Sequence, residues 1–146
     1  MAPRPGVYLA KTEDEMIALG ARLAREWRRA AGVVLLIGNL GAGKTTLAKG
    51  IVEGLGVERA ENVSSPTFPL IHEYGNPVAV YHVDLYRLDT RAELDTLGLD
   101  EIFATDTLVL IEWGEKFAAA MPAQRREVRI SEEADGARRV EILERT

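Results

Sequence analysis

The chain has 146 residues, which fits one domain over residues 1 to 146. With no cysteine and two histidines it can form neither a disulfide framework nor, unaided, a zinc centre. The formal net charge of -5 argues against a surface that binds nucleic acid by neutralising many phosphates. The N-terminal stretch lacks a signal-peptide pattern, and no apolar run approaches the roughly 18 residues of a membrane span. We therefore expect a cytoplasmic protein without a membrane segment.

The first half of the chain predicts a helix, a buried strand and a second helix. Thr12 and Glu15 form a capping box before an apolar stripe, which predicts a helix over about residues 13 to 29. The segment "GVVLLIG" at residues 32 to 38 is apolar at consecutive positions, which is typical of a strand buried on both faces. Apolar residues at helical spacing between positions 47 and 55 then predict a second helix, ended by a glycine.

The second half predicts further strands around the same sheet. Residues 57 to 68 lack periodicity and predict a long loop, and "PLIHEY" with "PVAVYHVD" predicts an antiparallel hairpin. "TRAEL" at residues 90 to 94 begins with a capping box, and "TLVLIE" at 107 to 112 is a second deeply apolar strand. "REVRI" and "RRVEI" predict a hairpin with Arg and Glu on its wet face. Together these elements predict a three-layer α/β fold with a mixed, mainly parallel central sheet and a C-terminal β-hairpin.

The segment "GNLGAGKTTLAKG" at residues 38 to 50 carries the strongest functional signal. Gly38, Gly43, Lys44 and Thr45 match the pattern GxxxxGKT between a buried strand and a helix. In that setting backbone N–H groups and the positive end of the helix converge on phosphates. Lys44 would reach the β- and γ-phosphates, and the Thr45 hydroxyl would take a Mg²⁺ position. The motif predicts a P-loop NTPase; the alternative is a glycine-rich turn with a surface lysine.

Two acidic residues lie at the ends of predicted strands, and each is a candidate to bind the metal or to orient the attacking water. Asp84 ends "VAVYHVD" and Glu112 ends "TLVLIE", so both should lie at the C-terminal edge of the sheet, where ligands of open α/β folds bind. The run before Glu112 is continuously apolar and predicts the strand beside the phosphate loop, which makes Glu112 the better metal candidate. Asp84 is left to orient water or a hydrated metal. The alternative for both is an ordinary strand-end carboxylate.

Other candidate residues carry weaker signals. Thr67, in "SSPTF", is a candidate sensor of the γ-phosphate and Mg²⁺, although the segment could be a simple turn. His72 and His82 lie in strand-like runs, where a packed histidine is the simpler interpretation than a metal ligand, and neither is assigned a catalytic role. Trp27 fits a core stripe, whereas Trp113 either walls the site or caps the core.

Four segments in the same order resemble the TsaE family, P-loop ATPases of tRNA threonylcarbamoyladenosine biosynthesis. They are "GNLGAGKTTLAKG", "NVSSPTFPLIHEY", "VYHVDLYRLD" and, for the later elements, "LGLDEIF" with "LVLIEWGEKF". The resemblance implies that ATP and Mg²⁺ are the cofactors, that Thr45 and Glu112 ligate the metal, and that Asp84, Thr67 and Lys44 support hydrolysis. It also implies that the nucleotide is contacted by the loop residues Asn39, Leu40, Gly41, Ala42, Gly43, Lys44, Thr45 and Thr46. Contacts with the adenine base would come from Thr12, Glu13 and Gly136.

The resemblance also implies partners. Members of this family work with TsaB and TsaD, which transfer a threonylcarbamoyl group to adenosine 37 of tRNAs that read ANN codons. ATP hydrolysis would reset that complex between turnovers, and tRNA would be met only indirectly, through the complex.

Rival functions remain open at this point. A GTPase would need an NKxD element, which the chain lacks. A small-molecule kinase would need an arginine-bearing lid, for which "YRLDTRAELD" with Arg87 and Arg91 is the only plausible segment. A third possibility is a nucleotide-gated binding module whose output is a conformation. Binding to TsaB and TsaD with and without ATP would separate them, because a free-standing kinase should ignore those proteins.

Overall fold

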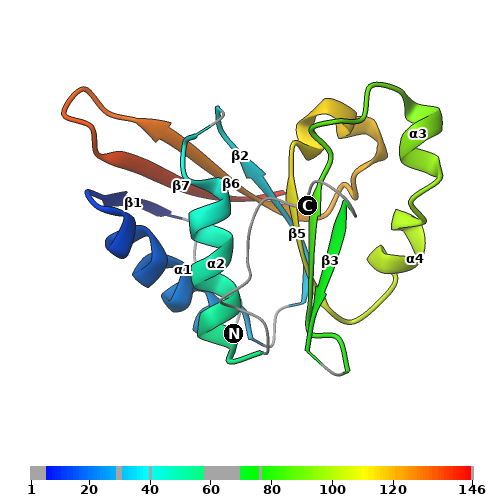
Figure 1. The fold of residues 1–146 in the computed structure, drawn as a ribbon, viewed down its shortest axis with the longest axis horizontal. Helices are drawn as coiled ribbons and strands as arrows, with labels where there is room; N and C mark the ends of the chain where they lie inside the picture. Colours follow the sequence, from blue (N-terminus) through cyan, green and yellow to red (C-terminus); the bar gives the residue numbers. More distant parts are fainter. Residues whose placement is uncertain (1–5, 29–30, 40, 58–69, 76, 146) are drawn as a thin grey trace.

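The structure is a computed structural model that describes residues 6–28, 31–39, 41–57, 70–75 and 77–145 (Figure 1). Leu40 and Thr67, both predicted site residues, lie outside the described residues. The elements in chain order are β1 (Gly6–Ala10), α1 (Glu13–Trp27), β2 (Gly32–Ile37), α2 (Lys44–Leu55), β3 (Ile71–Tyr74), β4 (Val80–Asp84), α3 (Arg91–Asp95), α4 (Leu99–Phe103), β5 (Leu108–Glu112), the 3₁₀ segment η2 (Gly114–Ala120), β6 (Arg125–Glu132) and β7 (Arg138–Arg145).

The strands form one seven-stranded sheet in the order β1-β7-β6-β2-β5-β4-β3. The four strands at its centre run parallel: β2 pairs with β6 and β5, and β5 pairs with β4. Both ends of the sheet are antiparallel, through the β3–β4 and β6–β7 hairpins and through β1 on β7. The predicted mixed sheet and C-terminal hairpin are thus confirmed, with parallel pairing confined to the centre.

Helices α1 and α2 lie side by side on one face of the sheet (Figure 1). Apolar residues of α1 fill this layer, with Leu23 and Trp27 at 0% and 1% exposure, and the helix starts at the predicted capping residue Thr12, which accepts a hydrogen bond from Glu15 N. Glycines bring the two helices into backbone contact, since a Cβ at Gly50 would overlap the Ile17 carbonyl. The phosphate-loop helix is therefore fixed by close packing on α1.

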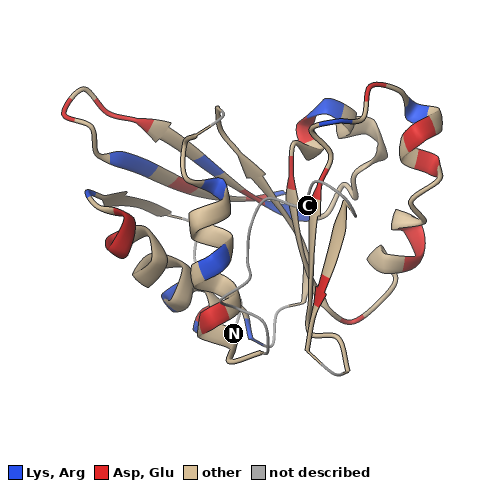
Figure 2. Ribbon diagram, in the orientation of Figure 1, with Lys and Arg blue, Asp and Glu red and all other residues tan. Residues whose placement is uncertain are grey.

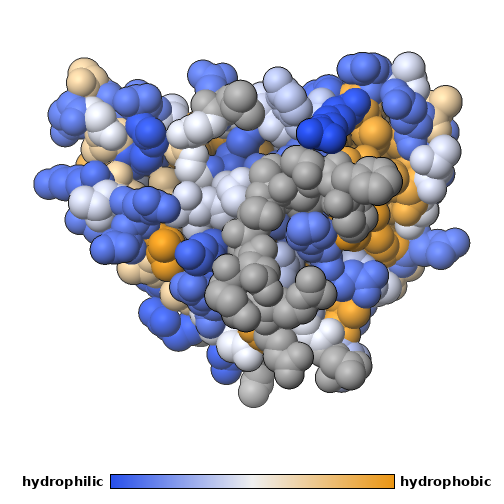
Figure 3. All heavy atoms as spheres, viewed as in Figure 1, coloured by the Kyte–Doolittle hydropathy of each residue, from blue (hydrophilic) through white to orange (hydrophobic). Residues whose placement is uncertain are grey.

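A second apolar layer covers the other face, but only over part of the sheet. It is built from β2, β4 and β5 with α3, α4 and η2, and none of its described residues belongs to β1, β6 or β7. Hydrophobic residues reach the surface on the side of α3 and α4 in Figure 3, where partly buried Ile102 and Phe103 pack on this layer. None of the described helices is long and apolar enough to cross a bilayer.

Three elements were not predicted from the sequence: β1, α4 and η2. The first of these matters for the site. β1 pairs antiparallel with β7 at the far edge of the sheet, so that Ala10 lies opposite Arg138. This pairing brings the segment before α1 next to the turn of the C-terminal hairpin.

Candidate nucleotide-binding site

The glycine-rich loop connects the end of β2 at Ile37 to the start of α2 at Lys44. Gly43 caps the helix with a φ of 114°, a conformation that side chains disfavour. A Cβ at Gly38 would lie 2.7 Å from the Ile130 carbonyl oxygen on β6, so only glycine fits there. The first backbone N–H groups of α2 have no helical acceptor of their own, and they open onto the loop. Strand, loop and helix therefore have the arrangement that the motif predicted.

Lys44 lies at the start of α2 with only 4% of its surface exposed. Its Nζ stands 3.6 Å from the centre of the Trp113 ring, and among the described residues it has no hydrogen-bond acceptor. Burial lowers the pKa of Lys44, and the carboxylates of Glu112, Glu115 and Asp84 oppose that shift. A buried ammonium without an acceptor, at the mouth of an anion-binding loop, fits a phosphate group.

Thr45 and Glu112, the predicted metal ligands, are in direct contact. The Thr45 hydroxyl lies 3.2 and 3.1 Å from the two carboxylate oxygens of Glu112. Nε2 of His82 also lies 2.7 Å from Glu112 Oε2, and His82 is fully buried. His82 is thus a packed, hydrogen-bonded histidine, as predicted. Its hydrogen bond with Glu112 was not predicted from the sequence.

The oxygen donors fit Mg²⁺ better than a transition metal. In the described part of the chain, no group of three or more His, Cys, Asp or Glu residues could hold a metal ion by itself. Mg²⁺ usually takes one or two protein oxygens and completes its shell with water and phosphate oxygens. A hydroxyl and a carboxylate side by side at a phosphate loop, as at Thr45 and Glu112, supply that minimal set.

Asp84 ends β4 directly opposite Glu112 in the parallel register of β4 and β5. Both carboxylates are buried, at 5% and 2% exposure, at the C-terminal edge of the sheet. Asp84 Oδ1 accepts a hydrogen bond of 2.9 Å from the Tyr86 backbone N–H, which fixes the carboxylate. The predicted position of both acids is therefore confirmed, and their division of roles stays a prediction.

Trp113 forms a wall of this site. It follows Glu112 with a φ of 65°, the only described non-glycine residue with positive φ, and its ring packs on Tyr86 with centroids 5.1 Å apart. Such a backbone conformation is rare for a bulky residue and often marks a functional position. Sequence analysis left open whether Trp113 walls the site or caps the core. The structure shows both contacts, because the ring faces the Lys44 ammonium and also packs against the second apolar layer. Tyr86 and Glu115 lie in the quoted segments "VYHVDLYRLD" and "LVLIEWGEKF" but were given no role, because their interactions with Asp84 and Lys44 arise only in the folded chain.

A cavity of about 330 Å³ lies beside the glycine loop. It contains three residues assigned to adenine by resemblance alone, Thr12, Glu13 and Gly136, together with loop residues Gly41 and Gly43. The remaining lining residues are Ala10, Lys11, Met16, Ala42, Thr46 and Arg138. The pairing of β1 with β7 brings these distant segments together. The cavity volume lies in the range of small-molecule sites.

A parallel-centred sheet whose buried strand runs through a glycine loop into a helix, with an acid on the neighbouring strand, defines a P-loop protein of the three-layer α/β class. The family model "Threonylcarbamoyl adenosine biosynthesis protein TsaE" matches residues 10–140. The chain belongs to the TsaE family, whose members take part in tRNA threonylcarbamoyladenosine biosynthesis.

Individual relatives agree with this assignment. The chain is 40% identical over 121 residues to the tRNA threonylcarbamoyladenosine biosynthesis protein TsaE of Bacillus subtilis, covering 82% of this chain and 74% of the relative. It is 43% identical over 115 residues to the protein of the same name from Haemophilus influenzae, covering 78% and 71%. Among solved structures, that of YdiB from Bacillus subtilis superposes with a TM-score of 0.79 at 30% identity, over 98% of this chain and 87% of YdiB.

Proposed function

We propose that this chain binds ATP with Mg²⁺ at the glycine loop and hydrolyses it. The observation that carries the proposal is the Lys44 ammonium, buried without a described hydrogen-bond acceptor beside the Thr45–Glu112 pair. A buried charge destabilises the folded protein unless a group of opposite charge compensates it, and the β- and γ-phosphates of a nucleotide would do so. The loop amides would bind the same phosphates, and the cavity that contains Thr12, Glu13 and Gly136 would take the base.

Thr45 and Glu112 would hold Mg²⁺, which when bound neutralises phosphate charge. Asp84 would orient the attacking water or a metal-bound water, held by its bond from Tyr86 N–H. Thr67, by family resemblance, would sense the γ-phosphate. Trp113 would wall the site beside Lys44.

Paired substitutions of the two acids test this assignment. Glu112→Ala should weaken Mg²⁺-dependent ATP binding, because it removes a metal ligand. Asp84→Ala should leave ATP affinity close to that of the parent and abolish most turnover, because a water-orienting group acts mainly in the transition state. Calorimetric titration with and without Mg²⁺, beside a steady-state ATPase assay, measures both effects. The reverse pattern would exchange the two roles, and parental behaviour of both variants would refute the site.

The cellular role would be that of the ATP-hydrolysing subunit that supports TsaB and TsaD in the cytoplasm. With them it would take part in forming N6-threonylcarbamoyladenosine at position 37 of tRNAs that read ANN codons. Membership of the TsaE family supports the pathway. The net charge of -5 supports indirect contact with tRNA, through the complex. Pull-down by TsaB and TsaD with and without ATP tests the partnership; a chain that ignores both proteins would favour the kinase alternative.

A further inference from the structure

Four charged residues form a cluster on the face of β6 and β7 that the second apolar layer leaves uncovered; we name it the Glu127 cluster. Its members are Glu127, Arg125, Arg129 and Arg145. Glu127 was expected on a wet face, yet only 3% of it is exposed, because three guanidinium groups surround its carboxylate. The nitrogen-to-oxygen distances are 2.9 Å from Arg125 Nε, 3.0 Å from Arg129 Nη2 and 2.8 Å from Arg145 Nε.

The cluster carries more positive charge than its glutamate needs. Burial raises the pKa of Glu127, but the hydrogen bonds from Arg145, Arg125 and Arg129 outweigh burial and hold that pKa below its usual value. Glu127 is therefore ionised at neutral pH, and one negative charge faces three positive ones. A single arginine would neutralise the one negative charge of Glu127. Counted alone, the four side chains carry a net charge of about +2, and Glu141, the cross-strand neighbour of Arg129, adds one carboxylate at the edge of the cluster.

The surplus guanidinium groups are fixed and still open to solvent. The side chains of Arg129 and Arg145 are 47% and 49% exposed. Among the described residues, Arg145 donates only through Nε and Arg129 only through one Nη2, so their other N–H groups are available to a ligand. Glu127 thus orients the two side chains in advance, which lowers the entropy cost of binding an anion. Figure 2 shows basic residues along β6 and β7, with acidic residues among them and at the end of the hairpin.

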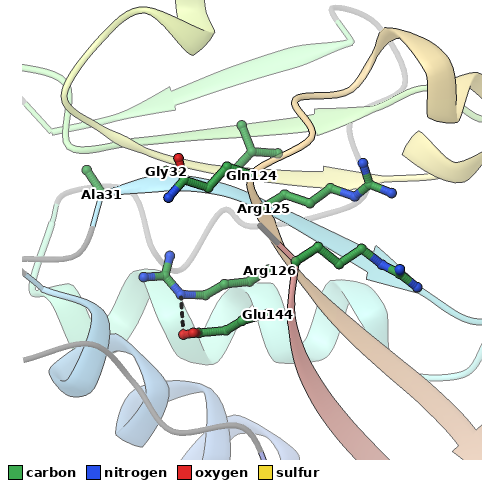
Figure 4. Close-up of a pocket in the computed structure, with 8 residues that line it drawn as sticks. Ala31, Gly32, Gln124, Arg125, Arg126 and Glu144 are labelled. Atoms are coloured by element: carbon green, nitrogen blue, oxygen red, sulfur yellow. Dashed lines mark ion pairs between the residues drawn. The ribbon is translucent and has the colours of Figure 1, made fainter.

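A cavity of about 340 Å³ adjoins the cluster at the start of β2 and β6 (Figure 4). Arg125 and Arg145 line it with Gln124 and Gly32, and Arg125 and Arg145 are cross-strand neighbours. Arg126 also lines it, but its guanidinium points to the other side of the strand, 3.8 Å from Glu144. Arg145 is therefore the guanidinium that links the cavity to the cluster, because Arg125 already donates to Glu127 and to the Pro122 carbonyl. Arg129 lies beside Glu127, outside the lining of the cavity.

This cavity is separate from the nucleotide site. Gly32 begins β2, whereas the glycine loop follows Ile37 at the other end of the same strand. At a rise of about 3.3 Å per residue, the two sites are roughly 17 Å apart. A ligand at Arg145 would thus leave the glycine loop free.

We propose that the Glu127 cluster and its cavity bind a phosphate group. A carboxylate offers two oxygens in one plane, which suits a single guanidinium fork, and Glu127 already fills that role. A phosphate presents tetrahedrally arranged oxygens and can accept from guanidinium groups on two strands at once. Its source is either a free polyphosphate or a phosphodiester of RNA, and direct RNA binding at this cluster would replace the indirect contact proposed above. The site does not depend on nucleotide binding by the glycine loop.

Site-resolved NMR titration tests the proposal without assuming anything about the nucleotide site. The backbone amide of Gly32 reports on the cavity, and the amide of Gly43 reports on the glycine loop. Inorganic pyrophosphate should shift the Gly32 signal to saturation. Arg145→Gln should raise the dissociation constant read at Gly32 about tenfold, whatever happens at Gly43. Glu127 keeps two arginines in this variant, and thermal unfolding checks that it folds.

Arg139→Gln is the matched control. Arg139 is exposed on the same strand and has the same charge, and it has no bond to Glu127. It should change the affinity at Gly32 by less than about twofold. A short A-form RNA duplex forms the second arm: tighter binding than pyrophosphate identifies a phosphodiester as the source, and a response to pyrophosphate alone identifies a free polyphosphate. An unmoved Gly32 signal with both probes, or equal affinities in the two variants, would overturn the proposal.

Discussion

Lys44 is the residue whose burial and charge argue most directly for an anionic ligand at this site. Its ammonium is buried over the face of the Trp113 ring and has no hydrogen-bond acceptor among the described residues, and burial lowers its pKa. A lowered pKa means that the folded state binds the proton less well than the unfolded state does. The charged form therefore costs stability when no ligand is present, and the nucleotide-free protein carries that cost.

Substituting Lys44 should accordingly separate stability from binding. Lys44→Met should raise the free energy of unfolding of the nucleotide-free protein by on the order of 1 kcal/mol at neutral pH, and should remove most affinity for MgATP. The stability gain should shrink as pH rises towards the ordinary lysine value of 10.5, because the folded parent then loses the unfavourable charge. Urea unfolding at several pH values, with calorimetric ATP titration, checks both parts. A variant less stable than the parent that binds ATP normally would contradict the prediction.

The fluorescence of Trp113 should change when the Lys44 ammonium moves away from its ring. Phosphates would draw the ammonium away from the ring that it now contacts at 3.6 Å. We expect the fluorescence of Trp113 to change and to saturate with added MgATP, because the ring loses a cation from its face. Trp113→Phe is the control and should abolish the change, since the remaining Trp27 is buried under α1 with 1% exposure. An equal signal change in that variant would place the response elsewhere.

At the scale of elements, the contact of α1 with α2 positions the glycine loop. Gly50→Ala should push the helices apart, because the added Cβ overlaps the Ile17 carbonyl. We expect a loss of about 2 kcal/mol or more in the free energy of unfolding and weaker ATP binding, since α2 carries Lys44 and Thr45. Glu53→Ala, at an exposed position of α2, is the control and should change both quantities little. Unchanged stability of Gly50→Ala would show that the helices can separate without cost.

The elements also show what sequence reasoning can reach. β2, β5 and α2 were predicted because their signals are local: continuous apolar runs, the GKT pattern, and a final glycine that has a φ of 70° in the structure. β1 was missed because its short sequence "GVYLA" carries exposed Val7 and Leu9 and gains its partner from the distant β7. Consequently the position of Glu112 was predictable, whereas the meeting of Thr12 with Gly136 depended on a pairing that no local pattern encodes.

At the scale of the molecule, the site holds more negative than positive side chains, which is unfavourable for phosphoryl transfer by the chain alone. Three carboxylates, from Asp84, Glu112 and Glu115, act on the single ammonium of Lys44. If the chain hydrolyses ATP as proposed, we expect positive charge for the developing phosphoryl oxygens to come largely from Mg²⁺ and from a partner protein. We predict slow ATP hydrolysis by the chain alone and a faster rate with TsaB and TsaD together. Steady-state assays with each protein singly and with both decide it; an unchanged rate with the pair, or strong stimulation by tRNA alone, would contradict the prediction.

The pairing of β1 with β7 has a consequence for the order of assembly during synthesis. A ribosome adds roughly 5 to 20 residues per second, so β1 would wait on the order of ten seconds for β7 to emerge. Until then Val7 and Leu9 lie on a strand without its neighbour, open to chaperones or to other unpaired strands. The cavity that joins Thr12 to Gly136 closes only at that final pairing. The glycine loop also waits for the end of the chain, because β2 pairs with β6 and Gly38 packs on Ile130 of that strand. Loop and cavity are therefore completed together, at the end of synthesis.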